Sequence, residues 1–196
     1  IPGEDACCIL LYGDIGESSD VTAAAIVREL MEAEASGKRI DVRINSNGGD
    51  VYTGIAIFNA LRGSKADIHI YVDGIAASMA SVIALCGKPV EMSKYARLML
   101  HSVSGGCYGN KTELRRCLEE VEALENTLCE MYAPRLGTSV EEIRARYFDD
   151  ADHWLKADEA LALGFIDGVY DADPVPEDST PEQVYRIFNN RLEQPL

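Results

Sequence analysis

The sequence predicts an α/β protein with a mostly parallel sheet covered by helices. Strand-like and helix-like segments alternate three times from the start of the chain, at the spacing of strand–helix–strand units. The length of 196 residues suits one domain with a small appendage. A chain of this size removes roughly 70% of its unfolded surface from water. The 47% of hydrophobic and 26% of charged residues are typical of a globular protein.

Hydrophobic periodicity defines the three strand–helix pairs. Strands are expected at residues 7–12, 39–45 and 68–72, and helices at 21–36, 51–61 and 76–86. Asp73 and Gly74 interrupt the third strand pattern, so we expect a turn there. The residues that follow are small or apolar, which predicts a buried helix that ends at Gly87.

The second half of the chain has a less regular pattern. Further strands are expected at residues 89–92, 97–100 and 165–170, and further helices at 111–131, 138–147 and 157–163. Asn110 with Glu113, and Thr138 with Glu141, form capping boxes for the first two of these helices. We expect the glycine-rich segment 102–109 and residues 148–157 to be loops.

Residues 1–171 therefore form one predicted domain, and residues 172–196 an acidic linker followed by a short helix. The linker contains prolines and acidic residues, and Thr180 with Pro181 resembles a helix start. Apolar side chains then make one narrow face. Because so short a helix is marginal alone, we expect it to dock on the body or a neighbouring subunit, or to fray.

Charge and cysteine usage exclude several classes of function. The formal net charge of −15 argues against nucleic acid and anionic membranes as partners. The six cysteines form no C-x-x-C pair and, with only three histidines, show no metal-site spacing. We therefore expect no cofactor and a reduced, cytoplasmic setting. No apolar run reaches the length of a membrane span.

Ser78 is the first candidate for chemistry. It lies at the predicted junction of a strand and a buried helix, where free backbone N–H groups favour negative charge. A serine so placed could attack a carbonyl while nearby N–H groups hold the oxyanion. The simpler interpretation is a helix cap, since serine is common there.

Two further elements could serve such a serine. Of the three histidines, His101 ends a predicted strand before a glycine-rich loop, which is where α/β proteins place functional groups. We expect His69 to be a packing or surface residue and His153 to be solvated. Gly48 and Gly49 follow another strand and could aim backbone N–H groups outward.

Four linked motifs resemble the Clp protease proteolytic subunit family. They are residues 44–50 (INSNGGD), 74–80 (GIAASMA), 99–101 (MLH) and 152–157 (DHWLKA), followed by the closing segment 158–167 (DEALALGFID). They occur in the family's order and cover about residues 7–171. The resemblance implies an α/β superhelix shared with crotonases and a long protruding handle helix that starts near residue 111.

The resemblance also implies which residues of this chain take the catalytic roles of the family. Ser78 resembles the nucleophile, His101 the general base and Asp152 the acid that orients the base. The backbone N–H groups of Gly49 and Met79 match the two donors of the oxyanion hole.

The substrate and the assembly are also implied by the resemblance. Gly48, Ser102, Gly105 and Gly106 correspond to positions that bind a peptide or protein substrate, with the glycine-rich segment as the strand on which the peptide pairs. Homo-heptamers or tetradecamers are implied, in which handle helices join two rings. The possible partners are an unfoldase ATPase or phage capsid proteins.

The sequence departs from the family pattern in places that leave alternatives open. Asn47 stands where the family usually has proline, and Ser102–Val103 where it has Gln-Pro. Because the first predicted strand begins close to residue 1, we expect the family's N-terminal axial loop to be short or missing, which would weaken the case for an ATPase partner. The chain resembles Clp-related proteases of phages and prophages, which are linked to head maturation.

Three other functions remain to be weighed. One is a prophage-derived ring or scaffold protein with an idle triad. The second is a crotonase-like acyl-CoA enzyme, which would use paired N–H donors but no serine at position 78. The third is a Ser–Lys dyad, for which none of Lys88, Lys94, Lys111 and Lys156 is placed clearly as a base.

Overall fold

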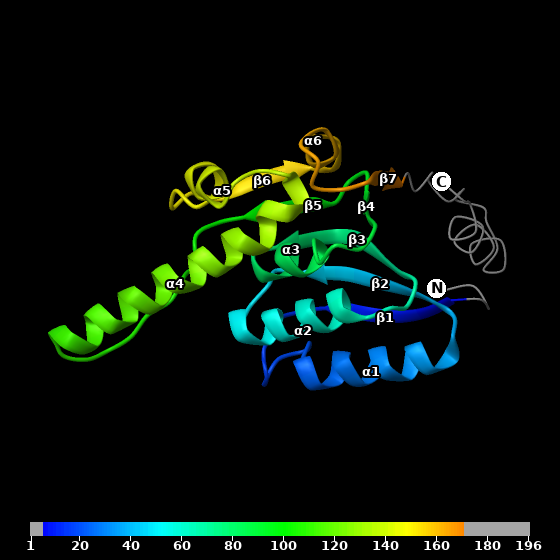
Figure 1. The fold of residues 1–196 in the computed structure, drawn as a ribbon, viewed down its shortest axis with the longest axis horizontal. Helices are drawn as coiled ribbons and strands as arrows, with labels where there is room; N and C mark the ends of the chain where they lie inside the picture. Colours follow the sequence, from blue (N-terminus) through cyan, green and yellow to red (C-terminus); the bar gives the residue numbers. More distant parts are fainter. Residues whose placement is uncertain (1–5, 171–196) are drawn as a thin grey trace, which may run out of the picture.

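Within residues 6–170, which the computed structural model describes, seven strands form one sheet (Figure 1). The strands are β1 (Ala6–Tyr12), β2 (Arg39–Ser46), β3 (Ile68–Ala77), β4 (Val90–Ser93), β5 (Arg97–Leu100), β6 (His153–Lys156) and β7 (Gly168–Tyr170). Their order is β1-β2-β3-β4-β7, and β5 pairs with both β3 and β6. Every pairing is parallel except that of β5 with β6. The predicted α/β class with a mostly parallel sheet is confirmed.

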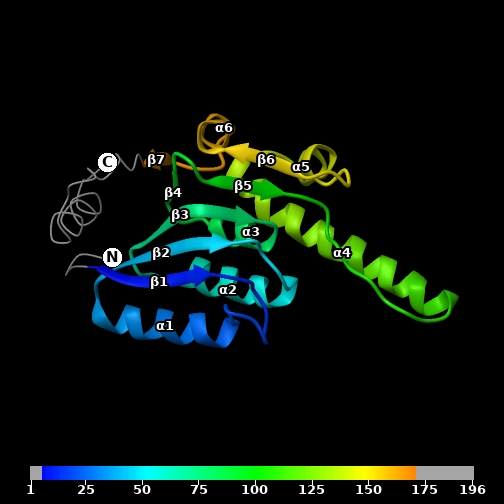
Figure 2. The same ribbon diagram turned by 180° about the vertical axis from the view of Figure 1, so that it is seen from behind.

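Six helices accompany the sheet in the same described range. They are α1 (Ala23–Ser36), α2 (Val51–Gly63), α3 (Met79–Ala84), α4 (Lys111–Leu136), α5 (Val140–Tyr147) and α6 (Ala157–Ala162). Figures 1 and 2 show α1 and α2 side by side along one side of β1–β3. The first half of α4 extends away from the rest of the molecule, as expected for the long helix.

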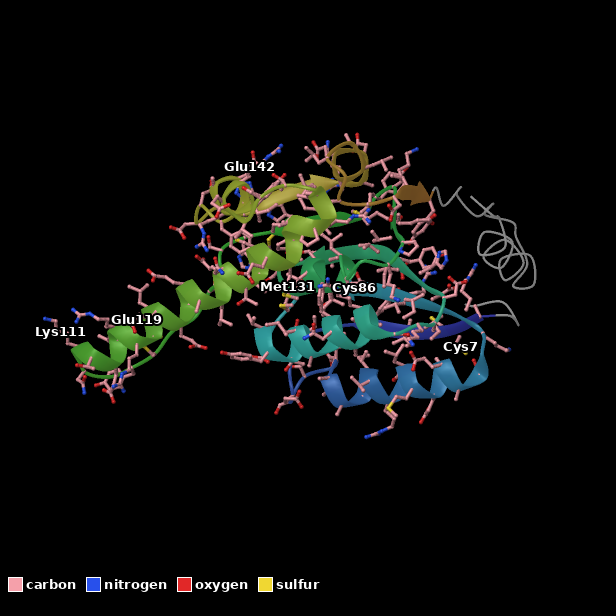
Figure 3. The ribbon with its side chains drawn as sticks, in the orientation of Figure 1. Cys7, Cys86, Lys111, Glu119, Met131 and Glu142 are labelled. Carbon is pink, nitrogen blue, oxygen red and sulfur yellow. The ribbon has the colours of Figure 1, made fainter. Side chains whose placement is uncertain are left out.

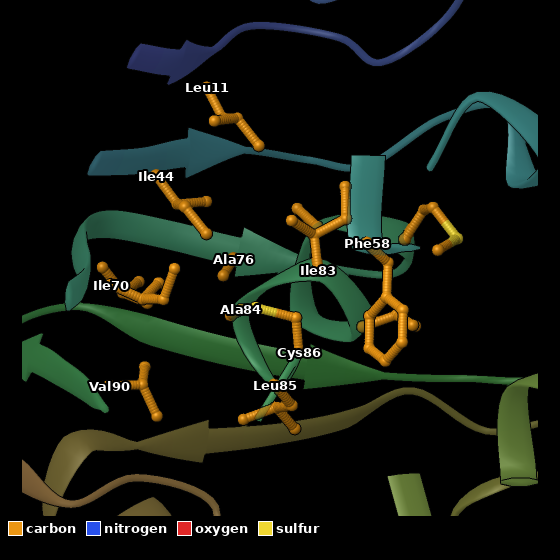
Figure 4. Close-up of a cluster of buried hydrophobic side chains, with 14 of the residues drawn as sticks. Leu11, Ile44, Phe58, Ile70, Ala76, Ile83, Ala84, Leu85, Cys86 and Val90 are labelled. Carbon is orange, nitrogen blue, oxygen red and sulfur yellow. The ribbon is translucent and has the colours of Figure 1, made fainter. Parts of the chain in front are cut away.

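The core lies between the sheet and these helices. Alternate side chains of the strands, such as Leu11, Ile44 and Ile70, are fully buried, as are Phe58 of α2 and Ile83 of α3 (Figure 4). Because β-strand side chains alternate between faces, β1, β3 and β4 give this core every second residue along much of their length. The close-packed core supports the junction between β3 and α3, where Ser78 lies.

The predicted turn at Asp73 and Gly74 is wrong, because β3 continues through both residues to Ala77. The strand changes partners there instead. Its first part pairs with β4 up to Val72, and its last part, from Ile75, pairs with β5. The register against β2 also shifts over this stretch. A local break in periodicity therefore marks an irregular strand rather than a turn.

A polar network on the open side of the sheet holds Asp73 in the strand. Its carboxylate accepts hydrogen bonds from both Arg43 Nε, at 2.8 Å, and Arg43 Nη2. The hydroxyls of Tyr12 and Tyr170 also donate to it, at 2.6 and 2.5 Å. Burial, followed by the hydrogen bond to Asp73, raises the pKa of Tyr12 to about 12. Three donor side chains from three strands thus satisfy one carboxylate.

Several other boundaries differ from the sequence prediction. The expected loop 148–157 contains β6, which forms the antiparallel edge with β5. The capping box of α5 joins Ser139 to Glu142 instead of Thr138 to Glu141. The box of Asn110 with Glu113 is confirmed. Helix α4 continues past residue 131, through Pro134, to Leu136.

The two halves of α4 have different surroundings. Figure 3 shows Lys111 and Glu119 on the half that extends outward, and Met131 on the half that meets the body. Met131 packs partly buried against the core. No helix within the described part of the chain combines the length and apolar character needed to cross a membrane. The predicted linker and helix of residues 172–196 lie outside the described residues.

We predict that Asp73→Ala lowers the free energy of unfolding by about 2–3 kcal/mol, because Arg43 would keep a half-buried charge without its carboxylate. Chemical denaturation measures this. The control is Asp67→Ala, which removes an acid whose side chain is 70% exposed beside His69. It should change stability by less than about 0.5 kcal/mol. Equal effects of the two substitutions would contradict the role of the network.

Candidate active site

Ser78 occupies a strained backbone position between β3 and α3. Its φ of 53° and ψ of −126° lie outside the regions that non-glycine residues favour. Such conformations cost of order 1–3 kcal/mol and persist only where the surroundings hold them. Ser78 N–H donates to the carbonyl of Met99 on β5 at 2.9 Å. The side chain makes no capping hydrogen bond to α3, so the helix-cap interpretation does not describe its side chain.

The Ser78 hydroxyl points to a histidine instead. Ser78 Oγ lies 2.7 Å from His101 Nε2, within hydrogen-bonding distance. His101 directly follows β5, and β5 pairs with the last residues of β3. Neighbouring parallel strands that end at one edge therefore bring together two residues that are 23 positions apart. This arrangement allows the imidazole to accept the hydroxyl proton.

Asp152 lies near the other ring nitrogen of His101, at a longer distance than that between Ser78 and the imidazole. Its Oδ1 is 3.6 Å from His101 Nδ1, and its side chain is 59% exposed. That distance fits an ion pair better than a direct hydrogen bond. Ser102 helps to hold this loop, since its buried hydroxyl accepts the N–H of Asp150 at 3.1 Å. Asp150 also adopts a positive φ of 67°.

His153, which was expected to be solvated, begins β6 directly after this loop and is partly covered. Its Nε2 lies 2.7 Å from Asp149 Oδ1, and its ring packs edge-on against Tyr147. The hydrogen bond to His153 is the main cause that lowers the pKa of Asp149. Both partners are thereby engaged with each other and not with Ser78. His69 lies in β3 beside Asp67, at 3.3 Å, away from this site.

The Gly48–Gly49 turn passes directly against the Ser78 backbone. A β-carbon at Gly48 would lie 2.6 Å from the Ala77 carbonyl and 2.9 Å from Met79 N, so only glycine fits there. Within the described residues, the N–H groups of Gly49 and Met79 donate no hydrogen bond to a backbone carbonyl. Gly49 and Met79 line the same pocket as Ser78, so their N–H groups are available to an oxyanion that forms there.

These groups line one pocket of about 150 Å³. Gly49, Ser78, Met79, His101 and Ser102 all border it, together with apolar side chains from α3 and α4. The remaining predicted positions lie elsewhere. Gly48 does not line the pocket but packs against the backbone of Ala77 and Met79, whereas Gly105 and Gly106 are exposed on the segment that leads to α4.

Sequence reasoning missed a buried chain that fixes the carbonyl of Ser78. Ser81 Oγ donates to Ser78 O at 2.6 Å and lies 2.7 Å from the hydroxyl of Tyr132 on α4. Burial raises the pKa of Tyr132 above its ordinary value. The contact of Ser81 could have been predicted from the sequence, because a serine in the first turn of a helix can donate to the carbonyl three residues before it. The contribution of Tyr132 needed the tertiary structure.

The site holds no cluster of metal ligands. Within residues 6–170, no three side chains of histidine, cysteine, aspartate or glutamate are grouped so that they could bind an ion.

We predict that Gly49→Ala destabilises the protein by about 2–4 kcal/mol, because φ is 146° and the new β-carbon would lie 2.1 Å from the Ile15 carbonyl. Thermal and denaturant unfolding measure the loss. Gly63→Ala is the matched control, since no atom lies within 4 Å of a β-carbon built there. A tolerated Gly49→Ala, with stability equal to that of the control, would show that the turn is not constrained as described.

Comparison with known proteins agrees with this geometry. The family model described as Clp protease matches residues 6–173. An ATP-dependent Clp protease proteolytic subunit from Bacteroides fragilis is 33% identical over 154 residues, which cover 76% of this chain and 73% of the relative. Subunit 1 from Prochlorococcus marinus subsp. pastoris is 35% identical over 158 residues, which cover 79% and 80%. The chain belongs to the Clp protease family and is a serine-type peptidase.

Proposed function

We propose that this protein hydrolyses peptide bonds with Ser78 as the nucleophile, His101 as the general base and Asp152 as the acid that orients the base. The observation that carries this proposal is the 2.7 Å contact between Ser78 Oγ and His101 Nε2 beside two unused amides. Peptides and proteins are the proposed substrates.

The first half of the reaction is acyl transfer. His101 Nε2 takes the proton of Ser78 as Oγ attacks the substrate carbonyl carbon. The imidazolium then gives this proton to the leaving amine, so that the peptide C–N bond breaks and an ester to Ser78 remains. Asp152 favours the tautomer in which Nδ1 carries a proton and Nε2 is free to accept one. In the second half of the reaction, water attacks the ester carbonyl carbon and His101 takes a proton from the water. The imidazolium returns this proton to Ser78 Oγ as the ester C–O bond breaks, which releases the carboxylic acid product.

The Gly49 and Met79 amides act on the intermediate. The attacked carbonyl oxygen becomes negative and would accept both N–H groups, which are already oriented by the glycine turn and by the first turn of α3. Loss of one such donor costs on the order of 10²–10³ in turnover. Gly48 supports this site by its shape, because its lack of a β-carbon allows the turn to reach Met79.

The segment after His101 is the proposed binding strand for the substrate. Among the described residues, those from 101 to 108 belong to no strand, and apart from Val103 N–H, which donates to Glu125, their N–H groups donate no hydrogen bond that would compete with a peptide. An extended peptide could pair with them by adding a strand. Ser102 lines the pocket, while Gly105 and Gly106 leave space beside the peptide backbone.

The alternatives make different demands on the site. A Ser–Lys dyad receives no support from Lys88, whose Nζ donates to the Ser64 carbonyl at 2.7 Å. A crotonase-like enzyme would not need the hydroxyl of Ser78 to contact an imidazole. An idle ring protein is the remaining alternative, and the exposure of Asp152 is the feature that favours it.

We further propose that copies of this chain form a heptameric ring, or a tetradecamer in which α4 joins two such rings. The helix presents two exposed leucines, Leu114 and Leu118, which are 49% and 58% accessible. Apolar side chains along a helix that projects from the body favour burial against another copy. The names of the relatives describe subunits of an ATP-dependent protease. We propose an ATPase or a phage capsid protein as partners, in accord with the sequence resemblance.

Our prediction for the chemistry is that a fluorophosphonate probe labels the wild-type protein and not Ser78→Ala, while Ser19→Ala labels normally because Ser19 is in an exposed turn. Mass spectrometry of the intact protein gives the extent of labelling. Equal labelling of wild type and Ser78→Ala would remove Ser78 from the mechanism. A wild-type protein that assembles normally but neither labels nor hydrolyses any peptide would favour the idle ring, and hydrolysis of a thioester alone would favour the crotonase-like enzyme.

Our prediction for assembly is that a double substitution, Leu114→Glu with Leu118→Glu, shifts native mass spectra from the large assembly to smaller species. Charges at these positions would oppose burial between copies. Leu161→Glu is the control, since Leu161 is also exposed, at 42%, but lies on α6. A wild-type protein that is only monomeric, or a double variant that assembles normally, would contradict the role given to α4.

A further inference from the structure

The glycine-rich segment lies along α4 in an antiparallel arrangement. Val103 N–H donates to Glu125 Oε1 at 3.1 Å. A β-carbon at Gly105 would lie 3.5 Å from Val121 Cγ2, and one at Gly109 would lie 2.5 Å from Glu113 Oε2. Figures 1 and 2 both show this segment beside the outer half of α4.

These contacts define a register that places two cysteines together. Each step of two residues along the segment corresponds to about four residues back along the helix, since both span roughly 6–7 Å. Between the contacts at Gly105 and Gly109, residue 107 therefore faces residue 117. Both positions are cysteine.

The state of the two thiols agrees with this register. Cys107 is exposed and Cys117 is half-buried, and both are free. A side-chain hydrogen bond with Cys117 is the first cause of the raised pKa of Cys107. The two side chains therefore lie close enough to interact, as the register requires.

The other cysteines of the described chain have no comparable partner. Cys86 and Cys129 are buried, and burial raises the pKa of each to about 11. Cys7 Sγ contacts the hydroxyl of Ser36 at 3.2 Å. Cys7 and Cys8 are adjacent on β1, so their side chains point to opposite faces of the sheet.

We propose that Cys107 and Cys117 form a reversible disulfide within one chain, which ties the glycine-rich segment to α4. The oxidant is a low-molecular-weight disulfide such as oxidised glutathione. One protein thiolate attacks a sulfur of the oxidant and releases one small thiol. The second protein thiolate then attacks the mixed disulfide and releases the other small thiol. Two protein thiols are oxidised and one small disulfide is reduced, and the two protons pass to the released thiols.

The disulfide would control the segment that begins directly after His101. Closing the loop from residue 107 to residue 117 removes conformational freedom from the segment. The consequence for catalysis rests on the proposed function. If this segment binds the substrate, it loses less conformational freedom on peptide binding in the oxidised protein. KM therefore falls while kcat changes little.

The experiment uses the full-length protein equilibrated in glutathione buffers of increasing redox potential. Maleimide labelling and non-reducing peptide mapping follow each cysteine. We expect labelling to be lost at Cys107 and Cys117 together, with one linked peptide that joins them and with full recovery on reduction. Amide hydrogen exchange should slow in residues 103–109 of the oxidised protein.

Two sets of variants separate the possible outcomes. Cys107→Ser and Cys117→Ser should each abolish the linked peptide and the change in exchange, whereas Cys7→Ser should retain both. Only mixed disulfides with glutathione, or a disulfide between two chains, would overturn the proposal. A disulfide with unchanged KM would confirm the link and refute its role in binding, and fluorophosphonate labelling tests Ser78 independently of both.

Discussion

The structure depends on the backbone of Ser78 being held in a conformation that it would not adopt alone. A serine at φ 53° and ψ −126° carries strain of order 1–3 kcal/mol. Its N–H is bound by the Met99 carbonyl, and its own carbonyl by Ser81. Both partners belong to buried elements of the core. The core thus places the hydroxyl at the sheet edge, with the Met79 amide next to it.

The residues around this point differ in how firmly they are held. Ser78 and His101 lie at the ends of paired strands, and their contact is 2.7 Å. Asp152 lies on an exposed loop at 3.6 Å from the imidazole. An exposed carboxylate in water interacts weakly with a charge, and more strongly once a substrate excludes water. In the proposed mechanism, peptide binding would therefore tighten the last member of the triad.

Much of the fold could be predicted because it follows from local patterns. Alternation of apolar residues identified β1, β2 and the first part of β3, and the cap at Asn110 located the start of α4. Irregular features could not be found in this way. Asp73 and Gly74 resemble a turn locally, yet the arginine and two tyrosines that hold Asp73 come from β1, β2 and β7. Strand β6 forms only because β5 offers it an edge.

The candidate site, like the fold, could be predicted from the sequence only in part. The motifs and the family resemblance pointed to Ser78, His101 and the glycine turn, and these border one pocket. Spacing alone could not choose an acid among 33 acidic residues. It also could not show that Tyr132, from the far half of the chain, completes the support of the Ser78 carbonyl. Such contacts depend on how α4 crosses the body.

The most direct test is a crystal structure of the protein with a peptide boronate bound covalently to Ser78 Oγ. The account predicts that one boronate oxygen lies about 2.7–3.1 Å from the amide nitrogens of both Gly49 and Met79. It also predicts that His101 Nε2 stays within hydrogen-bonding distance of the adduct. An adduct whose oxygens contact neither amide, or an imidazole turned away from it, would contradict the account.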